Sequence, residues 1–141
     1  MIRYELEKAM IAGGLKAADI PGEWNRLYKE VLGVDVPDDR RGCLQDSHWS
    51  FGGMGYFPSY VLGSAYGVQM LRQMEKDVDV WGTVEKGDLF PVTAWLTEKI
   101  HQYGQLKKPR DLLPAAMGGP LDAAVYTRYL KKKFGELYGI A

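Results

Sequence analysis

Apolar residues recur every three or four positions through most of the chain, and no segment shows the apolar–polar alternation of a half-buried strand. The segment from Pro21 to Gly33 shows this best, with an apolar face made of Trp24, Leu27, Tyr28, Val31 and Leu32. Proline in the first turn and glycine just past the last turn are typical helix boundaries. The pattern predicts an all-α fold of five to six helices.

The same spacing and boundary signals place the remaining helices. We expect helices over about residues 2–12, 21–32, 58–79, 88–103, 109–117 and from 122 onward, with residues 81–87 as a short connection. In the first helix, polar Arg3, Glu5, Glu7 and Lys8 lie opposite the apolar residues. Gly63 and Gly67 fall inside the longest helix, where each glycine costs up to about 1 kcal/mol relative to alanine. We therefore expect another helix or a ligand to approach them closely.

Composition limits the classes of partner. The chain has 141 residues, the length of one ordinary domain, and its 18 basic residues balance 18 acidic ones. This balance argues against binding to nucleic acid or to an anionic membrane surface. A lone cysteine, Cys43, excludes an internal disulfide, and no apolar run approaches the roughly 20 residues that span a bilayer. We expect a soluble, cytoplasmic protein folded as a single helical domain over residues 1–141.

Chemically versatile side chains concentrate between Gly42 and Tyr60, a glycine-rich segment that we expect to form a long ordered loop or a broken helix. A zinc site within the chain is not expected, because His48 and His101 are the only histidines and do not form a helical pair. Asp46, His48 and a neighbouring serine contain the residue types of a catalytic triad. Residues adjacent in sequence rarely give triad geometry, so we do not predict one. Cys43 is best interpreted as a buried structural thiol.

Two interpretations remain for His48, Tyr56 and Tyr60. All three side chains can donate hydrogen bonds, which suits them to hold a substrate carbonyl or a developing oxyanion. Alternatively they are packed aromatics whose polar tips bond to the backbone, and composition alone favours this simpler interpretation.

A family resemblance bears on this choice. The run Gly42-Cys43-Leu44-Gln45-Asp46-Ser47-His48-Trp49 resembles the GxxQDxHW signature of the Taq-type thermostable metallocarboxypeptidases at every fixed position. The continuation over residues 55–60 and the region from Gly118 to Leu130 also resemble the C-terminal end of that family. The resemblance covers essentially the whole chain, which would make it the C-terminal segment of a larger helical metallopeptidase fold.

The resemblance implies a function and a set of site residues. Family members are all-α, usually dimeric enzymes that release C-terminal amino acids from peptides with a zinc or cobalt ion. By resemblance, His48 contacts a substrate carbonyl, and Tyr60 or Tyr56 stabilises the oxyanion. The resemblance assigns Gln45, Asp46 and Trp49 to substrate binding, as a shell that supports His48.

The family's metal-binding motif HExxH is absent, as are its downstream glutamate and its I/VRxxAD motif. We therefore expect no metal ligands in this chain and no peptidase activity from the chain alone. The leading interpretation is a C-terminal part of a metallocarboxypeptidase, from a truncated or split gene, whose N-terminal catalytic part lies elsewhere. The alternative is a non-enzymatic helical remnant that serves as an oligomerisation module, with a homo-oligomer as its form.

Overall fold

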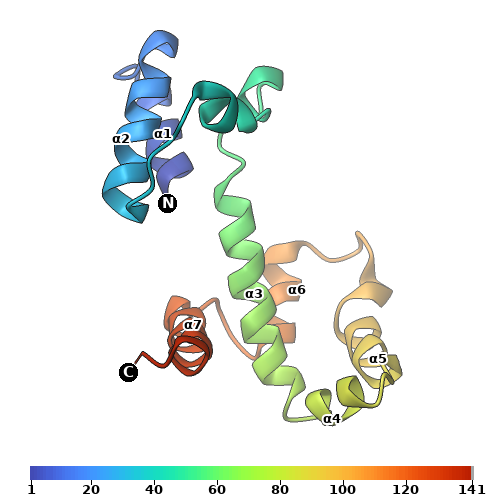
Figure 1. The fold of residues 1–141 in the computed structure, drawn as a ribbon. Helices are drawn as coiled ribbons and strands as arrows, with labels where there is room; N and C mark the ends of the chain where they lie inside the picture. The colour runs from blue at the N-terminus through green and yellow to red at the C-terminus, as the bar shows by residue number, and fades with distance from the viewer. Residues whose placement is uncertain (141) are drawn as a thin grey trace. The chain divides into compact units, whose positions relative to one another are not determined.

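A computed structural model describes residues 1–140, and every regular element in that range is helical (Figure 1). This confirms the all-α prediction. No helix in the described range is long and apolar enough to cross a membrane. The α-helices are α1 (Ile2–Ile11), α2 (Ile20–Leu32), α3 (Pro58–Met74), α4 (Val80–Glu85), α5 (Phe90–Lys99), α6 (Pro109–Met117) and α7 (Ala123–Tyr138).

Helix α4 accounts for the difference between these seven helices and the five to six expected. We expected residues 81–87 to be a connection and the preceding helix to reach residue 79, but that helix ends at Met74. The Asp79 side chain starts α4 by accepting a hydrogen bond from the Gly82 backbone N–H at 3.1 Å. A Cβ at Gly82 would lie 2.1 Å from Asp79 Oδ2, so the glycine makes room for the cap.

The chain divides into two compact units, residues Met1–Val61 and the residues from Leu62 onward. In the first unit α1 packs on α2, around the buried residues Ile2, Leu6, Trp24 and Cys43. In the second unit α4 packs on α5, and the core cluster is Met74, Val80 and Trp95. Composition gave no sign of this division. The expectation of a single helical domain stays a prediction.

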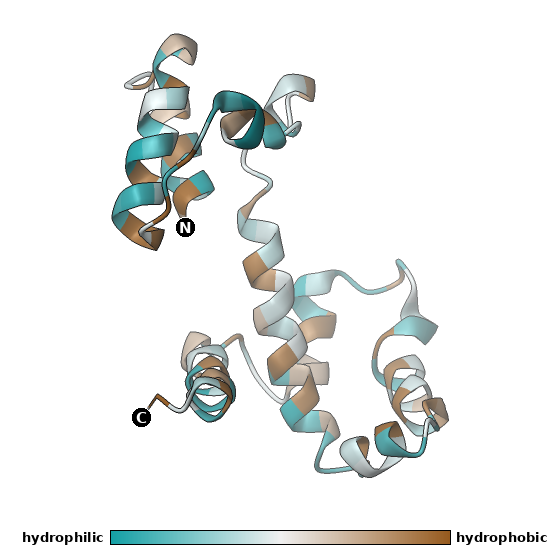
Figure 2. Cartoon of the chain, in the orientation of Figure 1, coloured by the Kyte–Doolittle hydropathy of each residue, from teal (hydrophilic) through white to brown (hydrophobic). Residues whose placement is uncertain are grey.

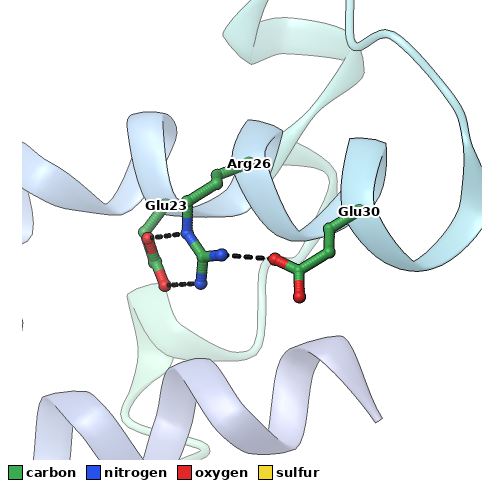
Figure 3. Close-up of polar contacts among 3 residues, drawn as sticks. All are labelled: Glu23, Arg26 and Glu30. Carbon is green, nitrogen blue, oxygen red and sulfur yellow. Dashed lines mark hydrogen bonds and ion pairs between the residues drawn. The ribbon is translucent and has the colours of Figure 1, made fainter.

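Helix α2 turns a charged face to solvent. Figure 2 shows hydrophilic residues interspersed with hydrophobic ones along it, and Figure 3 shows Arg26 between Glu23 and Glu30 on this face. Hydrogen bonding to Glu23 raises the pKa of Arg26, and the same interaction lowers the pKa of Glu23. Exposed pairs of this kind contribute little to stability. The charged residues of α2 thus lie on its solvent-facing side, while Trp24 enters the core.

The second unit is held together by a buried glutamine. Gln69 on α3 donates from Nε2 to the Pro120 carbonyl oxygen at 2.8 Å and accepts at Oε1 from the Asp122 backbone N–H at 2.9 Å. Asp122 in turn caps α7 by accepting from the Ala124 N–H at 2.9 Å. The loop that leads into α7 is therefore fixed to α3.

No helix among the described residues approaches Gly63 or Gly67 closely, and the approach of a ligand stays a prediction. A Cβ built on either glycine meets no atom within 4 Å among the described residues. Within the described part of the chain, packing gives no reason for these two glycines, so this face of α3 is open.

We predict that replacing Gln69 with leucine destabilises the protein by about 2–3 kcal/mol, because the Pro120 and Asp122 backbone groups lose their partners. Urea unfolding followed by circular dichroism measures the change. The matched control is Gln105→Leu at an exposed position, which should change the unfolding free energy by less than about 0.5 kcal/mol. Equal stability of the two variants would contradict the prediction.

Candidate functional site

The segment 42–60 is an ordered series of short turns, within the loop-or-broken-helix expectation. Two 3-10 turns, Cys43–Gln45 and Trp49–Phe51, precede the start of α3 at Pro58. The first position of the signature is constrained by packing. A Cβ at Gly42 would lie 2.7 Å from Val36 Cγ1 and 3.1 Å from the Asp38 carbonyl oxygen. Any side chain at Gly42 would collide with Val36 and with the Asp38 carbonyl oxygen unless the turn moved.

The structure brings His48, Tyr56 and Tyr60 together. The His48 ring stacks on Tyr56 with ring centroids 5.7 Å apart and lies edge-on to Tyr60 at 6.2 Å. His48 Nε2 lies 3.2 Å from the Tyr60 hydroxyl oxygen, within hydrogen-bonding distance. Phe57 is buried against the other side of this group, 4.7 Å from the His48 centroid. The imidazole is thus fixed by aromatic contacts on several sides.

Exposure determines what this cluster can do. Tyr56 is 50% and Tyr60 is 55% exposed, so both phenols are accessible to a ligand. His48 Nδ1 is buried and makes no hydrogen bond within the described residues, whereas Nε2 faces the Tyr60 hydroxyl. An imidazole N–H and a phenolic O–H that meet at one point can both donate to the same carbonyl or oxyanion oxygen. The arrangement is suited to hold such an oxygen.

Asp46 is held by an ion pair with the first helix. Arg3 on α1 donates from Nε to Asp46 Oδ2 at 2.6 Å, and the Asp46 side chain is only 8% exposed. The guanidinium also lies over the rings of Trp24 and Phe57, at 5.4 and 5.5 Å from their centroids. Burial acts to lower the pKa of Arg3, but the hydrogen bond and charge of Asp46 outweigh it and raise the pKa. The contacts of Asp46 are internal.

Trp49 also faces the interior. It packs edge-on against Trp24 at 6.0 Å and against Phe57 at 5.8 Å, and its indole Nε1 donates to Glu7 Oε1 at 3.2 Å. Gln45 is exposed and donates from its side-chain amide to the Arg40 carbonyl oxygen. The predicted roles of Gln45, Asp46 and Trp49 in substrate binding stay predictions. For Asp46 and Trp49, the internal contacts favour a role in supporting His48 over direct contact with substrate.

Sequence reasoning missed Glu7, which was expected on the polar side of the first helix. The structure buries it, with only 2% of the residue exposed, and its Oε1 accepts from both Trp49 Nε1 and the Gly55 N–H. The signal was available. Glu7 lies one turn after Arg3 and three residues before Met10, so it borders the apolar stripe of α1.

The residues of this chain do not fit a metal ion by themselves. No group of three or more His, Cys, Asp or Glu side chains converges anywhere in residues 1–140. Structural and catalytic metal sites need at least three protein ligands of this kind. The second unit contains a hollow of about 660 Å³, whose lining includes Val68, Leu71, Arg72, Trp81 and Tyr129. It contains none of the predicted site residues.

Comparison with known proteins gives consistent matches. The sequence model of the family described as Carboxypeptidase Taq (M32) metallopeptidase matches residues 1–134. Carboxypeptidase 1 of Bacillus subtilis (strain 168) is 40% identical over 139 residues, which are 98% of this chain and 28% of that protein. Thermostable carboxypeptidase 1 of Pyrococcus furiosus is 37% identical over 135 residues, covering 95% of this chain and 27% of that protein.

A solved structure agrees with these matches. The BsuCP crystal structure superposes with a TM-score of 0.90 at 40% sequence identity, over 96% of this chain and 28% of that one. The chain therefore spans about a quarter of the length of the proteins it resembles.

We predict that removing one partner of the Arg3–Asp46 pair destabilises the first unit. Arg3→Met leaves the carboxylate of Asp46 buried without its cation, at a cost of about 2–4 kcal/mol. The control is Arg26→Met, which breaks the surface pairs with Glu23 and Glu30 and should cost less than about 1 kcal/mol. Thermal and urea unfolding compare the variants, and equal losses would contradict the prediction.

We also predict that Cys43 reacts slowly in the folded protein. Burial raises the pKa of the Cys43 thiol, the Asp39 charge adds to this, and a raised pKa leaves less reactive thiolate at pH 8. A chromogenic disulfide reagent should modify the native chain at least about tenfold more slowly than the urea-unfolded chain. Equal rates in the two states would show an accessible, ordinary thiol.

Proposed function

The chain belongs to the carboxypeptidase Taq (M32) metallopeptidase family, and on that premise we propose that it supplies the substrate-facing wall of a metallocarboxypeptidase groove. The proposal makes it equivalent to the C-terminal portion of the longer enzymes. The observation that carries it is the meeting of His48, Tyr56 and Tyr60 within and just after the family signature. Their substrate is the C-terminal end of a peptide.

In this proposal the residues of the chain bind and orient the peptide. The His48 imidazole donates to a carbonyl oxygen of the substrate. The Tyr60 hydroxyl, 3.2 Å from His48 Nε2, donates to the oxygen that becomes negative during attack. Tyr56 stacks on His48 and its ring centroid lies 5.3 Å from that of Tyr60, which provides a second phenol beside the first. Removing one such donor typically lowers turnover by about 10²–10³-fold.

The metal and its ligands are assigned to polypeptide outside this chain. Bound zinc or cobalt would supply the Lewis acid and the activated water of the reaction. HExxH is absent from the 141 residues, and no cluster of metal ligands occurs among the residues that the structure describes. The chain alone is accordingly proposed to be inactive as a peptidase. We likewise propose the cytoplasmic location expected from composition and the dimeric state that the resemblance implies.

The second candidate function is a non-enzymatic oligomerisation module. Large apolar side chains are unusually exposed for a monomer, among them Phe90 at 77% and Leu106 at 89%, and the Gly63–Gly67 face of α3 is open. Such surfaces favour association with further polypeptide, either a second copy or the part that carries the metal. A monomeric molar mass at high concentration, with no uptake of a metal-bearing partner, would count against both forms of association.

We predict that the purified chain releases no C-terminal amino acid from a peptide in the presence of zinc or cobalt, whereas a chimera does. In the chimera, the matching 98% of this chain replaces the corresponding 28% of Bacillus subtilis carboxypeptidase 1. Liquid chromatography measures the release of free amino acids by the isolated chain and by the chimera. Metal-dependent release by the isolated chain would refute the proposed division of labour, and a folded, metal-loaded but inactive chimera would refute the proposed function.

We further predict that His48→Ala and Tyr60→Phe each lower kcat of the active chimera by about 10²-fold or more, because each removes a donor to the substrate oxygen. The matched controls are His101→Ala and Tyr138→Phe, two exposed positions that no site assignment uses. The controls should keep at least about half of the activity. Equal losses in the site and control variants would show that His48 and Tyr60 act only through folding.

A further inference from the structure

Glu7 is the least exposed charged residue among residues 1–140, at 2% exposure. An ionisable group in the interior is expensive unless its hydrogen bonds compensate the lost water. Its Oε1 accepts two hydrogen bonds, while Oε2 is buried and makes none within the described residues. Half of the carboxylate is therefore satisfied and half is not.

The two donors to Oε1 lie directly beside two residues of the proposed site. The Trp49 indole Nε1 is 3.2 Å away, and Trp49 follows His48. The Gly55 backbone N–H is 3.1 Å away, and Gly55 precedes Tyr56. We infer that Glu7 is a positioning residue, whose carboxylate fixes the loop at both ends so that the rings of His48, Tyr56 and Tyr60 meet. The catalytic consequence of this placement rests on the proposed function, but the placement itself does not.

The loop needs such a fixed point because of its composition. Between Trp49 and Tyr56 it contains three glycines, which allow many backbone conformations. Gly55 has φ +76°, and Gly53 donates from its N–H to the His48 carbonyl oxygen at 2.7 Å. The Gly52 N–H also donates to the Trp49 carbonyl oxygen and the Met54 N–H to the Gly52 carbonyl oxygen, so backbone hydrogen bonds close the His48 end, whereas the Gly55 N–H beside Tyr56 donates to Glu7. The Glu7 oxygen supplies the missing constraint from a rigid helix.

Methionine at this position separates the packing role of Glu7 from its hydrogen bonds. The methionine side chain would fill the same space beside the apolar residues of the α1–α2 core but could not accept the hydrogen bonds from Trp49 and Gly55. Because both N–H groups would then lose their acceptor, we expect the substitution to lower the stability of the unit as well as the order of the loop. The signals of Trp49, Gly55 and His48 report on the loop, and the Trp24 signal reports on the core.

The test uses the full 141-residue chain labelled with ¹⁵N and compares Glu7→Met with Glu7→Gln by nuclear magnetic resonance. In Glu7→Met the Gly55 amide should exchange with solvent at least about tenfold faster. The Trp49 indole N–H should shift toward a free indole, and the ring contact between His48 and Tyr60 should weaken. Glu7→Gln should retain all three signals, because its amide oxygen accepts both hydrogen bonds. The Trp24 indole signal should be unchanged in both variants, which shows that the core is intact.

Two further variants make the outcome decisive. Glu5→Gln changes an exposed carboxylate on the same helix, which pairs with Lys8, and should leave every signal at the wild-type value. Glu7→Asp keeps the charge but withdraws it by one methylene, so it should resemble Glu7→Met and decides the question if Glu7→Met does not fold. Wild-type Gly55 exchange and His48–Tyr60 contact in Glu7→Asp would overturn the inference, as would their loss in Glu7→Gln. None of these signals depends on substrate or metal, so an inactive chimera and a failed positioning test are distinguishable results.

Discussion

The first unit depends on two charged side chains, one helical turn apart on α1, that hold a loop more than forty residues away. Arg3 binds Asp46, and Glu7 binds Trp49 and Gly55. His48 lies between the first two of these loop positions, and Tyr56 follows the third. The indole, guanidinium and carboxylate interactions are all partly or fully shielded from water, where hydrogen bonds to charged groups are strong. The order of the aromatic cluster thus depends on residues that do not belong to it.

Much of the fold could be predicted from the sequence, because helix boundaries are local events. Proline at the start of α2 and α6 and glycine after α2, α6 and α7 place those ends without reference to the rest of the molecule. Helix α4 could not be predicted in this way. We expected residues 81–87 to form a connection, and only the three-dimensional approach of the Asp79 carboxylate to the Gly82 N–H shows that a helix begins there. Local composition was compatible with both outcomes.

The same difference between local patterns and long-range contacts applies to the candidate site. The grouping of His48 with Tyr56 and Tyr60 could be predicted because all three lie within thirteen residues, in a pattern that resembles a family signature. The burial of Glu7 was missed although Glu7 borders the apolar stripe of α1, because Arg3, Glu5, Glu7 and Lys8 together make that side of the helix look solvent-facing. The direction of a single side chain on a helix is set by what the helix packs against. Here that partner is a loop far away in the sequence.

Gly42 has a consequence for how the signature is interpreted in evolution. Its lack of a side chain is required because Val36 and the Asp38 carbonyl occupy the space, whatever reaction the protein takes part in. Asp46 and Trp49 are likewise engaged in holding the unit together. A descendant that lost peptidase activity would still be under selection to keep these three positions, while His48, Tyr56 and Tyr60 would be free to drift. Gly42, Asp46 and Trp49 of the signature therefore report on folding, and only His48 within it, with Tyr56 and Tyr60 after it, can report on catalysis.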